Sequence, residues 1–293
     1  MKKIVNEWDE TNAWKEVYSC VFLMIRCERR QSWRRWMESG VALVTGVGRL
    51  RGIGRAVCVE LAQRGFDIFF TYWSDYDQAM PWSVAADEPA QIQAELTAMG
   101  VRCESFELDL SLEDSVNTLL NTVEQVLGPP RILINNATYS TKTGIDTLTA
   151  SELDRHYAVN LRATTLLTLE FIRRFELGAG GRIINLTSGQ SLGPMSDEIA
   201  YAVTKGAIET LTTTLAQKIA TSGITINAVN PGPNDTGWMS DELRAQLLSA
   251  FPMGRVGIPA DAAKLIGFLA SAEATWITGQ VIHSEGGFRR ESL

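Results

Sequence analysis

The chain has 293 residues, 45% of them hydrophobic, so it is long enough to bury a full core. Its 27 Lys and Arg against 34 Asp and Glu give a net charge of −7, which argues against nucleic acid or an anionic membrane as a partner. The four cysteines form no C-x-x-C pair, and the two histidines, His156 and His283, are far apart. We therefore expect neither a disulfide framework nor a metal site.

Residues 1–39 differ in composition from the rest of the chain. They contain four of the eight tryptophans and carry a charge of 8 − 6 = +2, against 19 − 28 = −9 for the remainder. The apolar run at 21–25 is too short to span a bilayer and lacks a cleavage site, so we expect a cytoplasmic protein. One hypothesis is that translation begins at Met37, and the alternative is an amphipathic extension that docks on a partner or on the chain itself.

Beyond residue 39, short apolar runs alternate with helical patterns, which predicts a parallel sheet covered by helices. The predicted helices are 52–62, 89–99, 112–127, 157–175, 201–220 and 259–270. The predicted strands are 41–44, 67–72, 102–108, 131–137, 181–188, 224–230 and 279–283.

The first predicted strand ends at Thr45-Gly46, and Gly52-Ile53-Gly54 then opens a helix. A glycine turn before a helix lets the backbone approach a pyrophosphate, whose charge the helix N-terminus favours. A tight turn without a ligand is the alternative.

Tyr201 and Lys205 are four residues apart in a predicted helix, so their side chains share one face. A lysine charge beside a tyrosine favours the phenolate and lowers the pKa of the phenol toward neutrality. The alternative is that both side chains lie on a solvated helix face and have no catalytic role. Ser188 lies thirteen residues before Tyr201, where the fifth predicted strand ends.

Taken in order, the glycine turn, Asn135-Asn136-Ala137, Asn160, Ser188 and the Tyr201-Lys205 pair resemble the motifs of the short-chain dehydrogenase/reductase family. The resemblance runs from about Gly40 to Phe288 and is closest to its 3-oxoacyl-carrier-protein reductase-like members. It implies one Rossmann-type domain at 40–293, a doubly wound α/β fold with a seven-stranded parallel sheet in the order 3-2-1-4-5-6-7. It also implies a homotetramer or a homodimer.

The resemblance implies a catalytic set of Asn160, Ser188, Tyr201 and Lys205 for reduction of a ketone to a secondary alcohol. Tyr201 would donate a proton to the carbonyl oxygen while Ser188 hydrogen-bonds it. Lys205 would lower the pKa of Tyr201 and bind the nicotinamide ribose, and Asn160 would position a relay water. A small-molecule carbonyl or alcohol, most similar to a 3-oxoacyl thioester, is the expected substrate.

The cofactor implied is NADP(H), because Arg51 matches the position where relatives that prefer NADP often have a cation. NAD is the alternative, since Asp75 follows the second predicted strand. In relatives, counterparts of Asp109 and Leu110 contact the adenine, and the counterpart of Thr236 contacts the diphosphate. The full set of implied cofactor-binding residues is Gly46, Arg51, Gly52, Ile53, Gly54, Tyr72, Asp109, Leu110, Asn136, Ala137, Tyr201, Lys205, Pro231, Gly232 and Thr236.

Three segments depart from the family pattern. Five residues rather than the usual three separate Thr45-Gly46 from Gly52, and Thr138 stands where glycine is typical. The segment 73–88 is longer than usual, and it either packs near the adenosine end or is a surface insertion. Residues 237–257 alternate polar and apolar groups, which predicts a mobile lid over the substrate or an ordinary packed helix.

Two other functions stay open. The chain could act on a sugar, a steroid or another secondary alcohol, because one fold serves many substrates. It could also bind a dinucleotide without catalysis, as a sensor or a scaffold.

Overall fold

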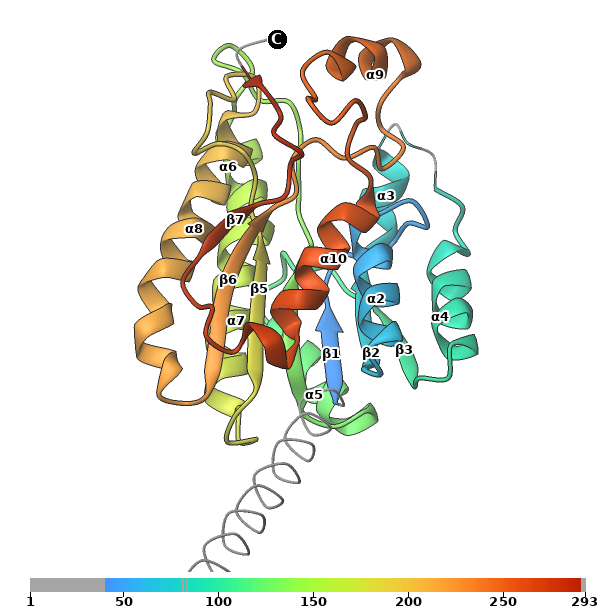
Figure 1. The fold of residues 1–293 in the computed structure, drawn as a ribbon, viewed down its shortest axis with the longest axis vertical. Helices are drawn as coiled ribbons and strands as arrows, with labels where there is room; N and C mark the ends of the chain where they lie inside the picture. Colours follow the sequence, from blue (N-terminus) through green and yellow to red (C-terminus); the bar gives the residue numbers. More distant parts are fainter. Residues whose placement is uncertain (1–39, 81, 83, 291–293) are drawn as a thin grey trace, which may run out of the picture.

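A computed structural model of the chain describes residues 40–80, 82 and 84–290, so the predicted extension at 1–39 lies outside the described residues. Seven parallel strands form one sheet in the order β3-β2-β1-β4-β5-β6-β7, which confirms the predicted Rossmann-type fold (Figure 1). The strands are β1 Val41–Val44, β2 Asp67–Tyr72, β3 Cys103–Glu107, β4 Pro130–Asn135, β5 Gly181–Leu186, β6 Ile224–Asn230 and β7 Val281–His283.

Helices cover both faces of the sheet. On one face, α2 Ile53–Gln63, α4 Glu88–Ala98 and α10 Pro259–Ala270 enclose one hydrophobic cluster. On the other face, α5 Ser115–Val126, α7 Thr164–Arg174 and α8 Ile199–Ala220 enclose a second cluster. Successive residues of β1 alternate between the two clusters, which explains why this strand is an unbroken apolar run.

Elements in three parts of the chain differ from what the sequence pattern predicts, and a short turn follows α10. The short helix α3, Ser74–Ala79, forms within the long segment after β2, and none of its residues is buried. The helix expected at 157–175 is preceded by α6, Ala150–His156, and opens with a π-helical stretch, η1, Tyr157–Ala163. Within 237–257, the helix α9 is confined to Asp241–Leu248, and a 3-10 turn, η2, follows α10 at Ala272–Ala274.

The strand order reverses between β1 and β4, which are neighbours in the sheet although β2 and β3 lie between them in sequence. In open parallel sheets, ligands bind at the carboxyl ends of the strands beside such a reversal. Figure 1 places α3 and α9 at this same end of the molecule. Among the described helices, none has the length and apolar character needed to cross a membrane.

Candidate active site

Helix α8 carries Tyr201 and Lys205 on one face, at the carboxyl end of the sheet. The Lys205 side chain is buried, and its Nζ donates a hydrogen bond to the Leu186 carbonyl at the end of β5, at 2.8 Å. The same Nζ lies 5.5 Å from the centre of the Tyr201 ring. The predicted shared face is therefore present, and the lysine fixes this part of α8 to the adjacent strand.

Burial controls the acid–base properties of the pair. It raises the pKa of Tyr201 above the ordinary 10.0, while a hydrogen bond with Ser188 acts in the opposite direction. Burial also lowers the pKa of Lys205 to about 8. The expected lowering of the Tyr201 pKa by Lys205 is not found, because desolvation outweighs the other influences, and Glu198 and Tyr76 raise the pKa further. Tyr201 is consequently protonated at neutral pH and able to donate.

Ser188 follows β5 and reaches Tyr201 from the neighbouring segment. It is half-buried and lies close enough to the Tyr201 phenol to lower the pKa of that group. The Ser188 Oγ also lies 3.9 Å from the Met195 sulfur. Two adjacent hydroxyls are suited to hydrogen-bond one oxygen atom of a substrate.

Asn160 joins three elements behind this pair. Its Oδ1 accepts from the Tyr139 backbone N at 2.7 Å and from the Thr138 hydroxyl at 3.1 Å. Its Nδ2 donates to the Tyr139 carbonyl at 2.9 Å and to the Thr204 hydroxyl at 3.2 Å. Asn160 lies inside η1, and single π turns within helices are frequent at functional sites. It therefore connects the loop after β4 to α8, one residue before Lys205.

The turn after β1 is shaped to receive a phosphate. Gly46 has a φ of +74°, and a Cβ there would meet the Ala137 Cα at 2.5 Å, so only glycine fits. The Asn136 Nδ2 donates to the carbonyls of Thr45 and Gly46, each at 2.8 Å, which holds the turn open.

Helix α2 then begins at Ile53, with Gly52 as an N-cap that has no side chain to cap it, and its first turn has no acidic residue. Its N-terminal backbone N–H groups are thus available to an anion. The turn and the helix N-terminus together fit the diphosphate of a dinucleotide.

The remaining predicted cofactor residues are distributed around this turn. Tyr72 ends β2 and is half-buried, and the Gly232 N–H donates to the Asn230 Oδ1 at 2.9 Å. Asp109 accepts from the Ser111 N–H and hydroxyl, both at 2.8 Å, which forms an Asx turn in the loop between β3 and α5. Leu110 is only 8% exposed and packs within the hydrophobic cluster rather than on the surface.

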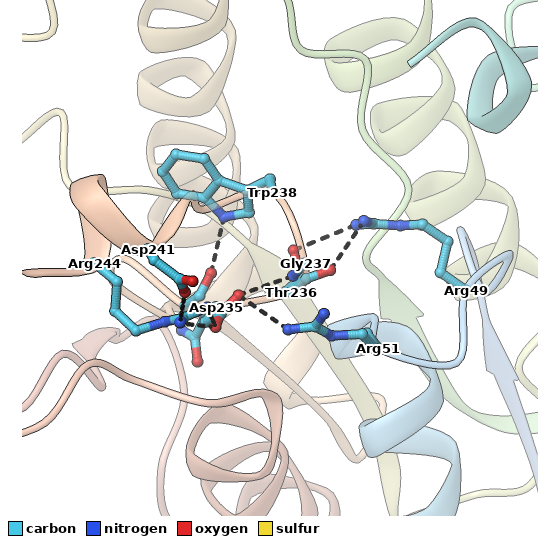
Figure 2. A network of polar contacts seen from close by, with 9 residues as sticks. Arg49, Arg51, Asp235, Thr236, Gly237, Trp238, Asp241 and Arg244 are labelled. Carbon is cyan, nitrogen blue, oxygen red and sulfur yellow. Dashed lines mark hydrogen bonds and ion pairs between the residues drawn. The ribbon is translucent and has the colours of Figure 1, made fainter. Parts of the chain in front are cut away.

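The lengthened glycine loop contacts the segment after β6 through two arginines (Figure 2). The Arg49 guanidinium donates to the Thr236 carbonyl at 3.2 Å and to its hydroxyl at 3.5 Å. Arg51 pairs with Asp235 at 3.4 Å, although its side chain is 66% exposed. Asp235 also pairs with Arg244 of α9 at 2.7 Å and accepts from the Gly237 N–H at 3.0 Å.

Arg49 is the residue that the sequence argument missed. The signal was present, because the two additional residues of the loop bring a second arginine close to the glycines. Tyr76 and Asp77 of the long segment after β2 were also not named. The excess length and the aromatic side chains of this segment, Trp82 among them, fitted packing near the adenosine end and a surface insertion equally well, and they did not indicate which contacts would form.

Comparison with known proteins agrees with this geometry. The profile of a family described as enoyl-(acyl carrier protein) reductase matches residues 46–289. The uncharacterized oxidoreductase YjdA of Bacillus subtilis (strain 168) is 52% identical over 86% of this chain and 98% of its own length. The 3-oxoacyl-[acyl-carrier-protein] reductase FabG of Staphylococcus epidermidis is 32% identical over 84% of this chain and 97% of its own length.

Among solved structures, the angucycline C-6 ketoreductase LanV with bound NADP is similar, with a TM-score of 0.75 and 30% identity. The match covers 85% of this chain and 97% of LanV. The fold, the paired Tyr201 and Lys205 and these relatives lead to one conclusion: the chain belongs to the short-chain dehydrogenase/reductase family of NAD(P)-dependent oxidoreductases.

Proposed function

We propose that the chain is an NADP(H)-dependent reductase that converts a ketone, most similar to a 3-oxoacyl thioester, to a secondary alcohol with Tyr201 as the general acid. The observation that carries this proposal is the protonated Tyr201 phenol, which lies near Ser188 and one helical turn from Lys205. The FabG and LanV relatives, whose names describe keto-reduction, support the reaction class.

In this proposal the bound cofactor supplies the hydride, and the residues of the chain manage the proton and the charge. Tyr201 donates its proton to the substrate oxygen as negative charge develops there, and Ser188 hydrogen-bonds the same oxygen. Lys205 provides a positive charge beside the phenol and a donor for the nicotinamide ribose. Asn160 positions a relay water behind Lys205 and keeps the loop after β4 in register with α8.

The preference for NADP(H) rests on the two arginines of the glycine loop. Arg49 and Arg51 put positive charge next to the α2 N-terminus, where a phosphate is favoured. Asp75, the residue that would favour NAD, is exposed on α3. The NADP bound in LanV is consistent with this preference. We also propose the homodimer or homotetramer that the family resemblance implies.

The substrate class is tested by following absorbance at 340 nm with a panel of acyl-thioester, sugar and steroid ketones, each with NADPH and with NADH. We expect oxidation of NADPH with acetoacetyl thioesters to exceed that with the other ketones. Faster turnover of a sugar or a steroid would replace the thioester in the proposal. Constant absorbance across the whole panel would favour a dinucleotide-binding protein without catalysis.

Tyr201→Phe removes only the phenolic hydroxyl. We expect turnover to fall by about 100-fold or more, the range typical of a lost general acid, because the developing alkoxide has no proton donor. NADPH affinity, measured by fluorescence titration, should stay close to that of the parent. The matched control is Tyr157→Phe, since that ring is 47% exposed on η1. Parental turnover in Tyr201→Phe would show that the acid is another group.

Arg51→Ala removes one of the two cations beside the α2 N-terminus. We expect NADPH to bind about tenfold more weakly, as for the loss of one charge-assisted hydrogen bond, with a much smaller change for NADH. Arg64→Ala, at the other end of α2 where the arginine pairs with Glu60, is the control. An equal loss of affinity for NADH would contradict a role of Arg51 in the preference for NADP(H).

The charge on Lys205 makes stability depend on pH. Its pKa of about 8 in the folded chain lies below the ordinary 10.5, so the unfolded chain binds more protons between these values. The free energy of unfolding should therefore rise from pH 8 toward 10.5, in total by no more than about 3 kcal/mol.

Urea unfolding between pH 7.5 and 9.5 measures this rise. Lys205→Met should lack it, whereas Lys218→Met, which alters an exposed lysine of the same helix, should retain it. If the free energy of unfolding changed with pH in the same way for the parent and for Lys205→Met, Lys205 would have no lowered pKa in the folded chain.

A further inference from the structure

The two lengthened segments of the chain pack against each other. The Asp77 carboxylate lies so close to Gly48 that a Cβ at that glycine would be 2.0 Å from the Asp77 Oδ2. At the other end of the long segment, the Glu88 carboxylate accepts from the Leu50 N–H at 2.6 Å. The glycine loop is thus contacted by two carboxylates, although its place at the α2 N-terminus suits an anionic ligand.

Arg49 is the cation that Asp77 faces. The Arg49 Nε lies 3.7 Å from the Asp77 Oδ1, and the two side chains are only 21% and 14% exposed. The Arg49 guanidinium also lies 4.3 Å from the centre of the Trp82 ring. Burial raises the pKa of the Asp77 carboxyl, while Arg49 lowers it. The Asp77 carboxylate is therefore partly desolvated, and Arg49 is the nearest positive charge that offsets this cost.

Tyr76, the residue before Asp77 in α3, lies near the proposed catalytic residues. The Tyr76 hydroxyl accepts from the Ser140 N–H in the loop after β4 at 3.3 Å, and its ring lies 5.6 Å from that of Tyr139. Tyr76 is also close enough to Tyr201 to raise the pKa of that phenol. Helix α3 therefore reaches from the end of β2 to the loop after β4, across the carboxyl ends of β1 and β4.

The anchorage of α3 is weak in comparison with the other helices. It has six residues, none of them buried, and its N-terminus has no side-chain cap. A short helix without a buried apolar face contributes little stability of its own and opens readily. Its contacts to the glycine loop and to Ser140 are polar, and another polar ligand can replace them.

We propose that α3 is a cover of the dinucleotide crevice, in which the Asp77 carboxylate takes the position of a cofactor phosphate beside Gly48 and Arg49. A dinucleotide then binds by displacing Asp77 from Arg49, and α3 moves away from the loop after β4. This inference rests on the proposed NADP(H) site and adds an internal competitor for it. The competitor lowers the affinity of the crevice for any phosphate-bearing ligand.

The test is the dissociation constant of NADPH and of NADH for the full chain, measured by fluorescence titration without substrate. Asp77→Asn keeps the size of the side chain and removes its charge, so we expect NADPH to bind about fivefold more tightly, the scale of one partly exposed ion pair. Asp87→Asn is the matched control, because it removes an exposed carboxylate from the same segment. It should leave the dissociation constant unchanged.

The two cofactors identify the phosphate that Asp77 replaces. A gain in affinity confined to NADPH would show that Asp77 takes the position of the 2′-phosphate. An equal gain in affinity for NADH would show that it takes the position of the diphosphate. Equal affinities of the parent, Asp77→Asn and Asp87→Asn would overturn the cover while leaving the cofactor assignment intact. Failure of the parent itself to bind either dinucleotide would overturn the proposed function and the cover with it.

Hydrogen exchange of the parent provides a measurement that needs no variant. On addition of NADPH, amides in 74–79 and at Ser140 should exchange faster as α3 leaves, while those at the start of α2 should become protected. Increased protection of 74–79 would mean that α3 closes on the cofactor rather than opening, and it would contradict the proposal.

Discussion

The hydrogen bond from the buried Lys205 ammonium to the Leu186 carbonyl is the interaction on which the site depends. It fixes the first turns of α8 to the end of β5, and two hydroxyls meet beside this contact, that of Tyr201 from the helix and that of Ser188 from the segment after the strand. A buried ammonium is stable only with a partner of this kind. The same burial keeps the Tyr201 proton on the phenol, so the arrangement is ready to protonate a substrate oxygen.

The glycine turn near this pair is surrounded by charged side chains that decide which ligands it favours. The glycine turn and the uncapped start of α2 favour an anion, and two arginines strengthen that preference. Each arginine already pairs with a carboxylate. Arg49 pairs with Asp77 of the segment after β2, and Arg51 pairs with Asp235 of the segment after β6. Under the proposal made above, cofactor binding is an exchange of anionic partners rather than entry into a preformed positive pocket. The affinity for the dinucleotide would then reflect the difference between these two sets of contacts.

Much of this was readable from the sequence. The central strands β1, β2, β4, β5 and β6 were predictable because they are buried on both faces and so form largely apolar runs. The spacing of Tyr201 and Lys205 placed them on one helix face. Other features depend on tertiary contacts. Helix α3 was missed because its six residues bury nothing and leave no apolar pattern. The direction of the Tyr201 pKa shift was wrong because desolvation, which outweighs the effect of a nearby charge, is set by packing.

We propose that the Tyr201 hydroxyl and the Lys205 ammonium face one bound nicotinamide, and a crystal structure of the full chain with NADP⁺ and a ketone tests this arrangement. We expect the nicotinamide beside Tyr201, the ribose hydroxyls on Lys205, and the ketone oxygen shared by Tyr201 and Ser188. A nicotinamide bound elsewhere, with Tyr201 in contact with neither cofactor nor ketone, would contradict it.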